Sequence, residues 1–523
     1  MDRLIFQIIR LMTNTIFKKR INTLKSVLTV TFGLFIGAAT AQQNVTITDA
    51  VLKDKIKGGW VGQTVGVTYG GPTEFIYNGV IIPDSVDIPW YHGYLAKTMH
   101  GVPGLYDDIY VDLTFLEKFY KHGLNVHMDT LAASLAHGAF PLDQANQVAR
   151  YNYLQGVRWP NIGHWKNNPH ADDIDFQIEA DFIGLMTPGM PNVTTTLANN
   201  VGQIMCYGDG VYGGVYMANM YALAFINNDI VDIVNKGLEG IPSSSEFAQC
   251  MRDVIKWHQA YPQDWKRTWR LVENKWNNDL CPNGAHREFN IDAKMNAAYV
   301  IMGLLYGGGD IEKTMDISTR SGQDSDCNPS SAAGILGTML GYSNIPSKWT
   351  SEVDDIENTP FMYTDISIKK ACDMSYDLAK KNILQNGGKA IGNDFIIATK
   401  KAKELKLNDS FPGMTVQMMK ELWHRFTDSY TLKFNGDGVV VVGEVKSHDG
   451  RIDADYVMEV EVFLNGKFME SFKMPAKNLI RRKDVYWNYN LSRKDNEVTI
   501  KVKNPKEGFD LHLISYAVYD KLK

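Results

Sequence analysis

The sequence predicts a multidomain protein, with an all-α domain over residues 46–426 and a small C-terminal β-sandwich over residues 430–523. At 523 residues the chain is longer than one ordinary domain. Apolar residues recur at three- and four-residue spacing as far as Phe426, and from Tyr430 they alternate over short runs. The chain lacks a regular succession of strands and helices, which disfavours a Rossmann-type sheet.

The first segment, residues 1–41, has the features of a secretory signal. Basic residues precede the apolar run "SVLTVTFGLFIGAATAQQ", and Ala39-Thr40-Ala41 has the small-x-small pattern of a cleavage site. We therefore expect an exported protein, periplasmic or secreted, that is not stably inserted in a membrane once the signal is removed. The alternative is an uncleaved anchor helix, which the shortness of the apolar run disfavours.

Net charge and cysteine usage exclude several classes of protein. The formal net charge is −5, and removal of residues 1–41, with six basic residues and one acidic residue, would bring it to about −10. Such an acidic chain is poorly suited to bind nucleic acid. The five cysteines are widely spread and form no CxxC pair, which argues against a disulfide framework or a zinc site. A single disulfide bridge is still compatible with an oxidising compartment.

The helical part contains several well-marked elements. The stretches "DIYVDLTFLEKFYKHG", "DTLAASLAHGAF" and "NAAYVIMGLLYGGGD" place apolar residues on one helical face and stop at glycine. In "KIKGGWVGQTVGVTYGGPTEF", four glycines are spaced for close helix packing: Gly58, Gly59, Gly62 and Gly66. The segment "LQNGGKAIGNDF" near residue 384 reads as a surface loop.

The stretch "SGQDSDCNPSSAAGILGTMLGYS" predicts another tightly packed helix. Asn328 suits its N-cap and Pro329 its first turn, while Gly334, Gly337 and Gly341 leave one side almost bare. Just before it, Asp324 and Asp326 lie one residue apart. Repulsion between such close carboxylates must be relieved by a proton, a cation or solvent.

The C-terminal part predicts short strands. "GVVVVGEVKSHDG", "YVMEVEVFLNGKFMESFKM" and "NEVTIKVKNP" alternate apolar and polar residues, and Asn465-Gly466 is a strong hairpin signal. Within "VYWNYN", the aromatic residues Tyr486, Trp487 and Tyr489 offer a possible platform for a sugar, but packing is the simpler expectation.

Three clusters of carboxylates stand far apart in the sequence. They are "YDDIYVDLTFLE", "HADDIDFQIEADFIG" and the run that contains Asp324 and Asp326. In the first, Asp112 lies one helical turn after Asp108; in the second, one helix would place Asp172, Asp175 and Glu179 on one face. Several aspartates that converge from helix ends suit hard cations such as Mg²⁺ and Ca²⁺.

Each cluster alone has a simpler interpretation, because acids at a helix start are usually solvated caps that favour the helix dipole. The third cluster fits this interpretation least. Small residues around Asp324 and Asp326 give little apolar cover, yet the helix that follows is predicted to be buried. Acids at the end of a buried helix need a partner, and a cation is a suitable one.

Taken in order, these segments resemble the ADP-ribosylglycohydrolase family. That family has a G-x-x-x-G-D-A-x-G helix followed by an acid, a Thr-Asp-Asp segment that opens a helix, and G-x-D-x-D-[ST] before a small-residue helix. The counterparts here are "GWVGQTVG" with Glu74, "YDDIYVD" and "GQDSDCNPSSAAGILGTMLGYSNIP". The resemblance covers roughly residues 48–425.

The resemblance implies an all-α domain with a binuclear Mg²⁺ centre that cuts a glycosidic bond at the anomeric carbon of a ribose. A centre with a single ion, or with a divalent ion other than Mg²⁺, is the alternative. Carried over by position, the metal ligands are Asp107, Asp108, Asp324 and Asp326. The candidate catalytic acids and bases are Glu74, Glu179 and, in reserve, Asp175. The candidate substrate-binding residues are Asp112, Asp181, Cys327 and Asn328.

Departures from the family pattern bear on the metals and the substrate. Tyr106 and Cys327 replace two hydroxyl ligands, and Gln63 replaces the Asp of the first motif. Glu179 and Asp181 introduce negative groups that would repel a diphosphate, and no basic cluster adjoins these motifs in the sequence.

Three functions follow as hypotheses. The first is an exported metal-dependent glycoside hydrolase that acts on a neutral sugar conjugate, a small molecule or a glycan. The second is an ADP-ribosyl hydrolase that acts on a modified protein or small molecule. The third is a carbohydrate-binding protein that has lost catalysis, for which Gln63, Tyr106 and Cys327 are the supporting features.

Overall fold

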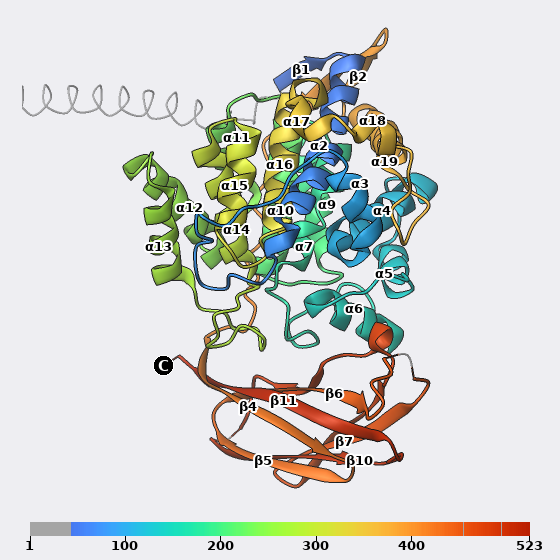
Figure 1. Cartoon of the computed structure of the whole chain (residues 1–523), viewed down its shortest axis with the longest axis vertical. Coiled ribbons are helices and arrows are strands. Elements are labelled where there is room, and N and C mark those ends of the chain that lie inside the picture. Colours follow the sequence, from blue (N-terminus) through green and yellow to red (C-terminus); the bar gives the residue numbers. More distant parts are fainter. Residues whose placement is uncertain (1–42, 453, 493, 523) are drawn as a thin grey trace, which may run out of the picture. The chain divides into compact units, whose positions relative to one another are not determined.

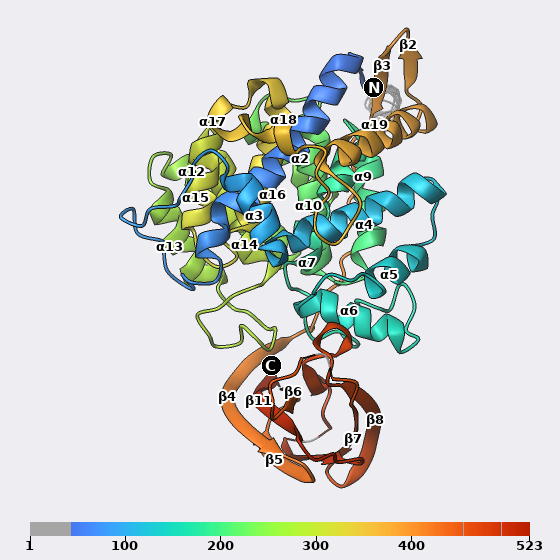
Figure 2. The same ribbon diagram turned by 45° about the vertical axis from the view of Figure 1, so that its right-hand side comes forward.

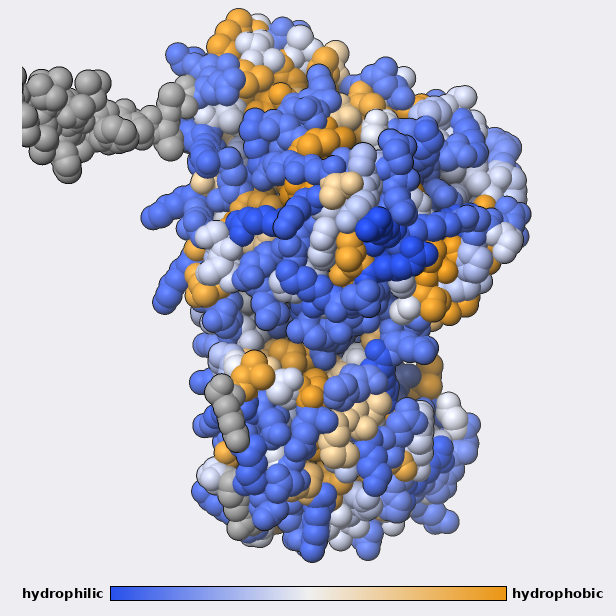
Figure 3. Space-filling model, turned by 90° about the vertical axis from the view of Figure 1, so that its left-hand side faces the viewer, coloured by the Kyte–Doolittle hydropathy of each residue, from blue (hydrophilic) through white to orange (hydrophobic). Residues whose placement is uncertain are grey.

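The computed structural model describes residues 43–522 except 453 and 493. The predicted signal segment 1–41 lies outside the described residues. Within them, a domain of α-helices is followed by antiparallel sheets, as the sequence predicts (Figure 1). No described helix is both long enough and apolar enough to cross a membrane. One face of the surface is largely hydrophilic, with scattered apolar side chains (Figure 3).

The helical domain runs from α2 to α19. Its helices are α2 (Asp49–Gly70), α3 (Tyr94–Gly101), α4 (Asp107–His122), α5 (Met128–Ala136), α6 (Gln144–Leu154), α7 (Asp175–Ile178), α8 (Asp181–Met186), α9 (Pro191–Gly202), α10 (Asp209–Ala224), α11 (Ile230–Gly237), α12 (Glu246–Ala260), α13 (Trp265–Trp276), α14 (Ala293–Gly307), α15 (Ile311–Arg320), α16 (Cys327–Leu340), α17 (Ser347–Thr350), α18 (Val353–Ile356) and α19 (Ile368–Gln385). The predicted helices at 108–123, 129–140 and 296–310 are confirmed as α4, α5 and α14.

Helices α2 and α16 pack face to face at the centre of this domain (Figure 1). A β-carbon added at Gly58, Gly62 or Gly66 would overlap a backbone carbonyl of α16. Small residues on both helices therefore let the two backbones touch. Helices α10, α14 and α16 are buried on nearly all sides. Because no side of these helices faces water, their sequences are apolar all round and have no polar face.

The helix predicted over the second acidic cluster does not form as one element. The chain makes only the single turn α7, breaks at Glu179 and Ala180, and starts again as α8.

Two further local predictions are wrong. Helix α16 begins at Cys327 with Asp326 at its N-cap, so Asn328 lies inside the first turn. The expected loop near residue 384 is a hairpin of β2 (Lys389–Ile391) and β3 (Asp394–Thr399), joined by β1 (Gln43–Ile47).

The C-terminal domain is a sandwich of two antiparallel four-stranded sheets, which Figure 2 shows from a second side. The strands are β4 (Met414–Phe426), β5 (Ser429–Asn435), β6 (Gly438–Ser447), β7 (Val457–Leu464), β8 (Lys467–Pro475), β9 (Asp484–Asn488), β10 (Asp495–Val502) and β11 (Phe509–Lys521). The sheet orders are β5-β10-β7-β8 and β4-β11-β6-β9. The hairpin at Asn465-Gly466 is confirmed, with positive φ at both residues.

The sandwich begins earlier than the sequence indicates. Strand β4 pairs with β11 along its length, so the β-domain starts at Met414 and not at residue 430. In "MTVQMMKELWHRF", Val416, Met419, Trp423 and Phe426 follow helical spacing. Pairing with β11 overrides this local pattern.

Aromatic residues join the sandwich to the helical domain. Phe411 and Tyr489 pack with ring centroids 4.7 Å apart, and Trp165 of the helical domain lies against both. The indole N–H of Trp487 donates to the carbonyl of Lys166 over 2.9 Å. The expectation that the "VYWNYN" aromatics pack is confirmed.

Candidate functional site

A strained loop places the first pair of candidate ligands. Gln323, just before Asp324, has a φ of +59°, a conformation that costs free energy for a residue with a side chain. Its carbonyl accepts from Phe75 N, its amide donates to Tyr77 O, and its side chain bonds the backbone of Glu288 and Asn290. This network holds the loop, and therefore both aspartates, at the start of α16.

Asp324, Asp326 and Cys327 offer ligand atoms that lie within 4.8 Å of one another. All three side chains are buried, and Asp326 Oδ1 has no hydrogen-bond partner in the described part of the chain. The Cys327 thiol lies 3.8 Å from the other oxygen of Asp326. A buried oxygen without a donor is costly unless a cation or proton occupies the space beside it.

Helix α4 brings the second pair to the same region. Asp107 and Asp108 open the helix, and Ser330 of α16 donates to Asp108 Oδ2 over 2.8 Å. Asp107 is partly exposed, whereas Asp108 is buried. Neither belongs to the group of ligand atoms that lie within 4.8 Å of one another, so Asp324 and Asp326 alone among the four predicted ligands reach that spacing.

Mutual repulsion shows how closely these acids are gathered. Burial and the charges of Asp108, Asp324 and Glu74 raise the pKa of Asp107 well above its usual value. Burial raises the pKa of Asp108 to about 7, with a further contribution from Asp324. Burial together with Asp324, Glu74 and Asp107 raises the pKa of Asp326. Aspartates from α4 and the loop before α16 therefore share one acidic cluster.

Glu74 lies at the exposed side of this cluster. It follows the turn Gly71–Thr73 after α2, and Thr73 Oγ1 lies 2.8 Å from Ser325 Oγ, which ties that turn to the Asp324 loop. Partial desolvation and the charges of Asp324, Asp143 and Asp108 raise the pKa of Glu74 to about 7. A carboxyl near neutrality that solvent can reach suits acid or base catalysis.

The other two catalytic candidates have different partners. Asp175 accepts from the backbone N–H groups of Ala145 and Asn146, so it caps the start of α6. Glu179 accepts from the Asn146 side chain through Oε1, and its Oε2 is buried without a partner among the described residues. Burial, Asp175, Asp107 and Asp112 raise the pKa of Glu179 well above its usual value. Burial and the nearby acids thus favour the protonated form of Glu179.

Three of the predicted substrate-binding residues lie too deep for direct access. Asp112 accepts from Gln63 Nε2 at 3.0 Å, and Asp181 accepts from the Tyr221 hydroxyl at 2.7 Å; neither carboxylate is exposed. Asn328 donates to Asn296 Oδ1 and is also fully buried. Cys327 stands with Asp324 and Asp326 as a potential ligand.

The two remaining family departures have structural partners. Gln63 hydrogen-bonds Asp112, one turn below the aspartate pair of α4. The Tyr106 hydroxyl lies 2.8 Å from Thr68 Oγ1 of α2, and its side chain is fully buried. Tyr106 therefore connects α2 to the start of α4.

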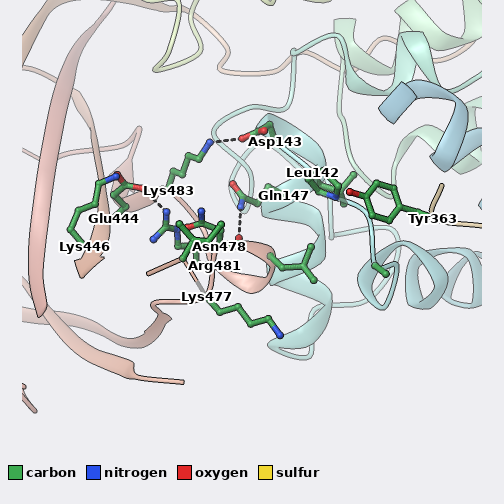
Figure 4. Close-up of a pocket in the computed structure, with 14 residues that line it drawn as sticks. Leu142, Asp143, Gln147, Tyr363, Glu444, Lys446, Lys477, Asn478, Arg481 and Lys483 are labelled. Atoms are coloured by element: carbon green, nitrogen blue, oxygen red, sulfur yellow. Dashed lines mark hydrogen bonds and ion pairs between the residues drawn. The ribbon is translucent and has the colours of Figure 1, made fainter. Parts of the chain in front are cut away.

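A cleft of about 540 Å³ lies between the helical domain and the sandwich. It begins beside Asp143, whose charge reaches Glu74, and Lys483 of the sandwich pairs with Asp143 (Figure 4). Tyr363 lies on its opposite side and contacts Tyr110 of α4, with ring centroids 5.0 Å apart. Four cationic side chains line it: Lys446, Lys477, Arg481 and Lys483.

Several residues of this region escaped sequence reasoning. Ser330 and Asn146 hold Asp108 and Glu179, but single polar residues within helices carry no distinctive signal. Tyr363 and the basic residues of the sandwich join the cleft only through tertiary contacts.

The comparison with protein families gives a match over the helical domain. Residues 48–381, well over half of the 523-residue chain, match the model of the ADP-ribosylglycohydrolase family. A solved structure described as an ADP-ribosylglycohydrolase-related protein complex is similar, with a TM-score of 0.44 and 13% sequence identity. That similarity covers 64% of this chain and 99% of the other. The comparison with curated proteins gives no match.

Proposed function

Since this chain belongs to the ADP-ribosylglycohydrolase family, and is thus a hydrolase, we propose that it is an exported, metal-dependent glycoside hydrolase acting on a sugar conjugate. The observation that carries the proposal is the acidic cluster. Carboxylates from α4, from the turn after α2 and from the loop before α16 raise one another's pKa values. Such crowding of carboxylates favours a bound cation.

The residues present fit a divalent cation. Asp326 Oδ1 is buried and unpartnered, and Asp107, Asp108 and Asp324 offer further carboxylate oxygens, the ligands that Mg²⁺ prefers. These four aspartates would hold one or two ions. When bound, a divalent cation supplies Lewis-acid chemistry, which polarises sugar oxygens and acidifies water.

The chain's own carboxyls supply the proton transfers. Burial and neighbouring acids raise the pKa of Glu179 well above its usual value, which favours its protonated form, and Asn146 donates to Oε1, which leaves Oε2 to carry a proton for the leaving group. Glu74, with a pKa near 7 and an exposed side chain, can accept the proton of a water at the mouth of the site. The cleft beside Asp143 would receive the rest of the substrate.

One observation favours the second candidate function, hydrolysis of an ADP-ribosyl bond. The cationic lining of the cleft, from Lys446, Lys477, Arg481 and Lys483, would suit the diphosphate of that substrate. Part of this charge is already balanced, because Glu444 pairs with Lys446 and Arg481, and Asp143 pairs with Lys483. We therefore retain the sugar conjugate as the first proposal.

The test measures release of reducing sugar from a glycan panel and of ADP-ribose from modified arginine and serine peptides. We expect glycan cleavage that requires Mg²⁺ and is lost in Asp324→Asn but kept in Asp84→Asn, an exposed acid paired with Lys266. Activity that survives both EDTA and Asp324→Asn would refute the metal role. Release of ADP-ribose alone would establish the second function, and glycan binding without turnover would establish a binding protein.

A further inference from the structure

A second group of buried metal-binding side chains lies apart from the site described above. Asp173, in the loop before α7, meets Asp279 and Cys281, in the loop between α13 and α14. One ligand atom from each lies within 4.8 Å of the others. Asp173 and Cys281 are fully buried, and Asp279 is 5% exposed.

Two carboxylate oxygens in this group lack a hydrogen-bond donor. Asp173 Oδ2 accepts from His170 Nδ1 at 2.8 Å, and Asp279 Oδ1 accepts from Cys281 N at 2.8 Å. The other oxygens, Asp173 Oδ1 and Asp279 Oδ2, are buried and unpartnered within the described chain. The loop closes tightly on the second of these, since a β-carbon at Gly284 would overlap it. Buried free oxygens of this kind need a cation or a proton.

The surroundings contain too few cations to balance these acids. His170 is the nearest positive group, with Nδ1 on Asp173 and Nε2 3.3 Å from Asp484 of β9, which is also buried. Lys294, the other buried cation nearby, is engaged at 2.5 Å by Asp292. Asp173 and Asp484 thus share one imidazole, and Asp279 raises the negative charge further in a region where unbalanced charge is costly.

We propose that Asp173, Asp279 and Cys281 form a second cation site, for a thiophilic divalent ion of the Zn²⁺ class. A thiolate with two carboxylate oxygens matches Zn²⁺ better than Mg²⁺ or Ca²⁺, which favour sets made only of oxygen ligands. Both nitrogens of His170 are occupied, so His170 orients Asp173 and does not bind the ion.

This site would hold together segments that meet beside the sandwich. It links the loop before α7 to the loop before α14, and His170 extends the connection to Asp484 of the β-domain. A cavity of about 290 Å³ is lined by Asp172 and Leu280, which are chain neighbours of the proposed ligands. We assign the ion a structural role, because its ligands come from two loops that it would hold together.

The experiment uses the full chain without a polyhistidine tag, stripped with chelator and loaded with Co²⁺. A thiolate ligand gives a sulfur-to-cobalt charge-transfer absorption in the near ultraviolet. Because Cys327 is the thiol of the first site, Cys281→Ser and Cys327→Ser are compared, with Cys250→Ser as a control for a buried cysteine elsewhere. We expect Cys281→Ser to remove all or part of the absorption and about one equivalent of bound Zn²⁺ by elemental analysis.

An absorption and a Zn²⁺ content that are the same in Cys281→Ser as in the unaltered chain would overturn the proposal. So would an unaltered chain without any thiolate absorption. If Cys281→Ser does not fold, anomalous diffraction at the zinc absorption edge, measured on crystals of the unaltered chain, shows whether the site binds Zn²⁺. An anomalous peak between Asp173, Asp279 and Cys281 supports the site, and a Zn²⁺-soaked crystal without one excludes it.

Discussion

Asp175 and Glu179 show how neighbouring acids of the same segment acquire different roles. Both are buried, and burial raises the pKa of Asp175 to about 8 and that of Glu179 well above its usual value. The oxygens of Asp175 accept from the start of α6, whereas Glu179 Oε2 has no hydrogen-bond partner among the described residues. Their hydrogen-bond partners, and not their spacing, separate the helix cap Asp175 from Glu179, the proposed proton donor.

Glu179→Gln should lower kcat by about 10²- to 10⁴-fold, the usual range for loss of a general acid. The amide keeps the size of the side chain and can still accept from Asn146, so metal content should not change. Asp175→Asn is the comparison, and it should mainly reduce stability, by about 1 kcal/mol, as a weakened cap does. Steady-state kinetics and urea unfolding on both variants check this, and a fully active Glu179→Gln enzyme would remove Glu179 from the mechanism.

Cys327→Ser should shift the metal preference of the first site toward Mg²⁺. The thiol lies with Asp324 and Asp326, where the family has a hydroxyl, and a hard ion prefers oxygen to sulfur. We expect Mg²⁺ to bind about tenfold more tightly, which corresponds to about 1.4 kcal/mol. Titration calorimetry with Mg²⁺ and Zn²⁺ measures the change. Equal affinities in both proteins would show that Cys327 does not contact the ion.

At the scale of elements, the close contact of α2 with α16 supports the acidic cluster. The glycine spacing in the sequence predicts this contact, but the partner helix and its direction come from the structure. Because α16 begins at Cys327 and Ser330 holds Asp108, a displacement of α16 would move both aspartate pairs relative to each other.

Gly62→Ala should destabilise the protein by about 3 kcal/mol, at the upper end for overpacked cores, because the added methyl would overlap the backbone of Ala333. It should also weaken Mg²⁺ binding. Gly104→Ala is the control, since a β-carbon at Gly104 would meet no atom within 4 Å. Urea unfolding gives both free energies, and equal values would mean that α2 and α16 adjust without cost.

Lys55 of α2 makes the free energy of unfolding depend on pH. Its ammonium donates to the carbonyls of Ala224 and Met339 at 2.7 and 2.8 Å, and burial lowers its pKa from 10.5 to about 8. The unfolded chain therefore binds more protons than the folded one between pH 8 and 10.5, and Lys55 contributes more favourably to stability as the pH rises. Relative to Lys55→Met, the unaltered chain should gain up to about 3 kcal/mol from pH 7 to 10.5. A difference in unfolding free energy that is independent of pH would contradict this.

At the scale of the whole molecule, the sandwich completes the cleft and is not only an appended domain. Arg150 of α6 donates to Leu479 O at 3.1 Å, and Gln147 donates to Asn478 O at the same distance. Through these contacts Lys477, Arg481 and Lys483 line the cleft together with Asp143 (Figure 4). Substrate choice should therefore depend on both domains.

Phe411→Ala should weaken the attachment of the sandwich, because Phe411 is 1% exposed and packs on Trp165 and Tyr489. Loss of a buried Phe costs about 3–5 kcal/mol. We expect a lower melting temperature and two calorimetric transitions where the unaltered chain shows one. Trp423→Ala, at an exposed aromatic of the same sandwich, should leave the transition nearly unchanged. A single transition of unchanged temperature in Phe411→Ala would argue against a cooperative interface.

Local signals in the sequence determined the class of the protein: helices from apolar spacing, strands from alternation, and the family from an ordered set of acidic motifs. Each of these depends on residues close together in the chain. Such local signals did not predict the start of β4, the break between α7 and α8, or the cysteine-containing group at Asp173. Tertiary structure decided them, because strand pairing overrides local periodicity and because charges come together across more than a hundred residues. The cationic side of the cleft also could not be predicted, because its basic residues belong to the sandwich and lie far along the chain from the acidic motifs.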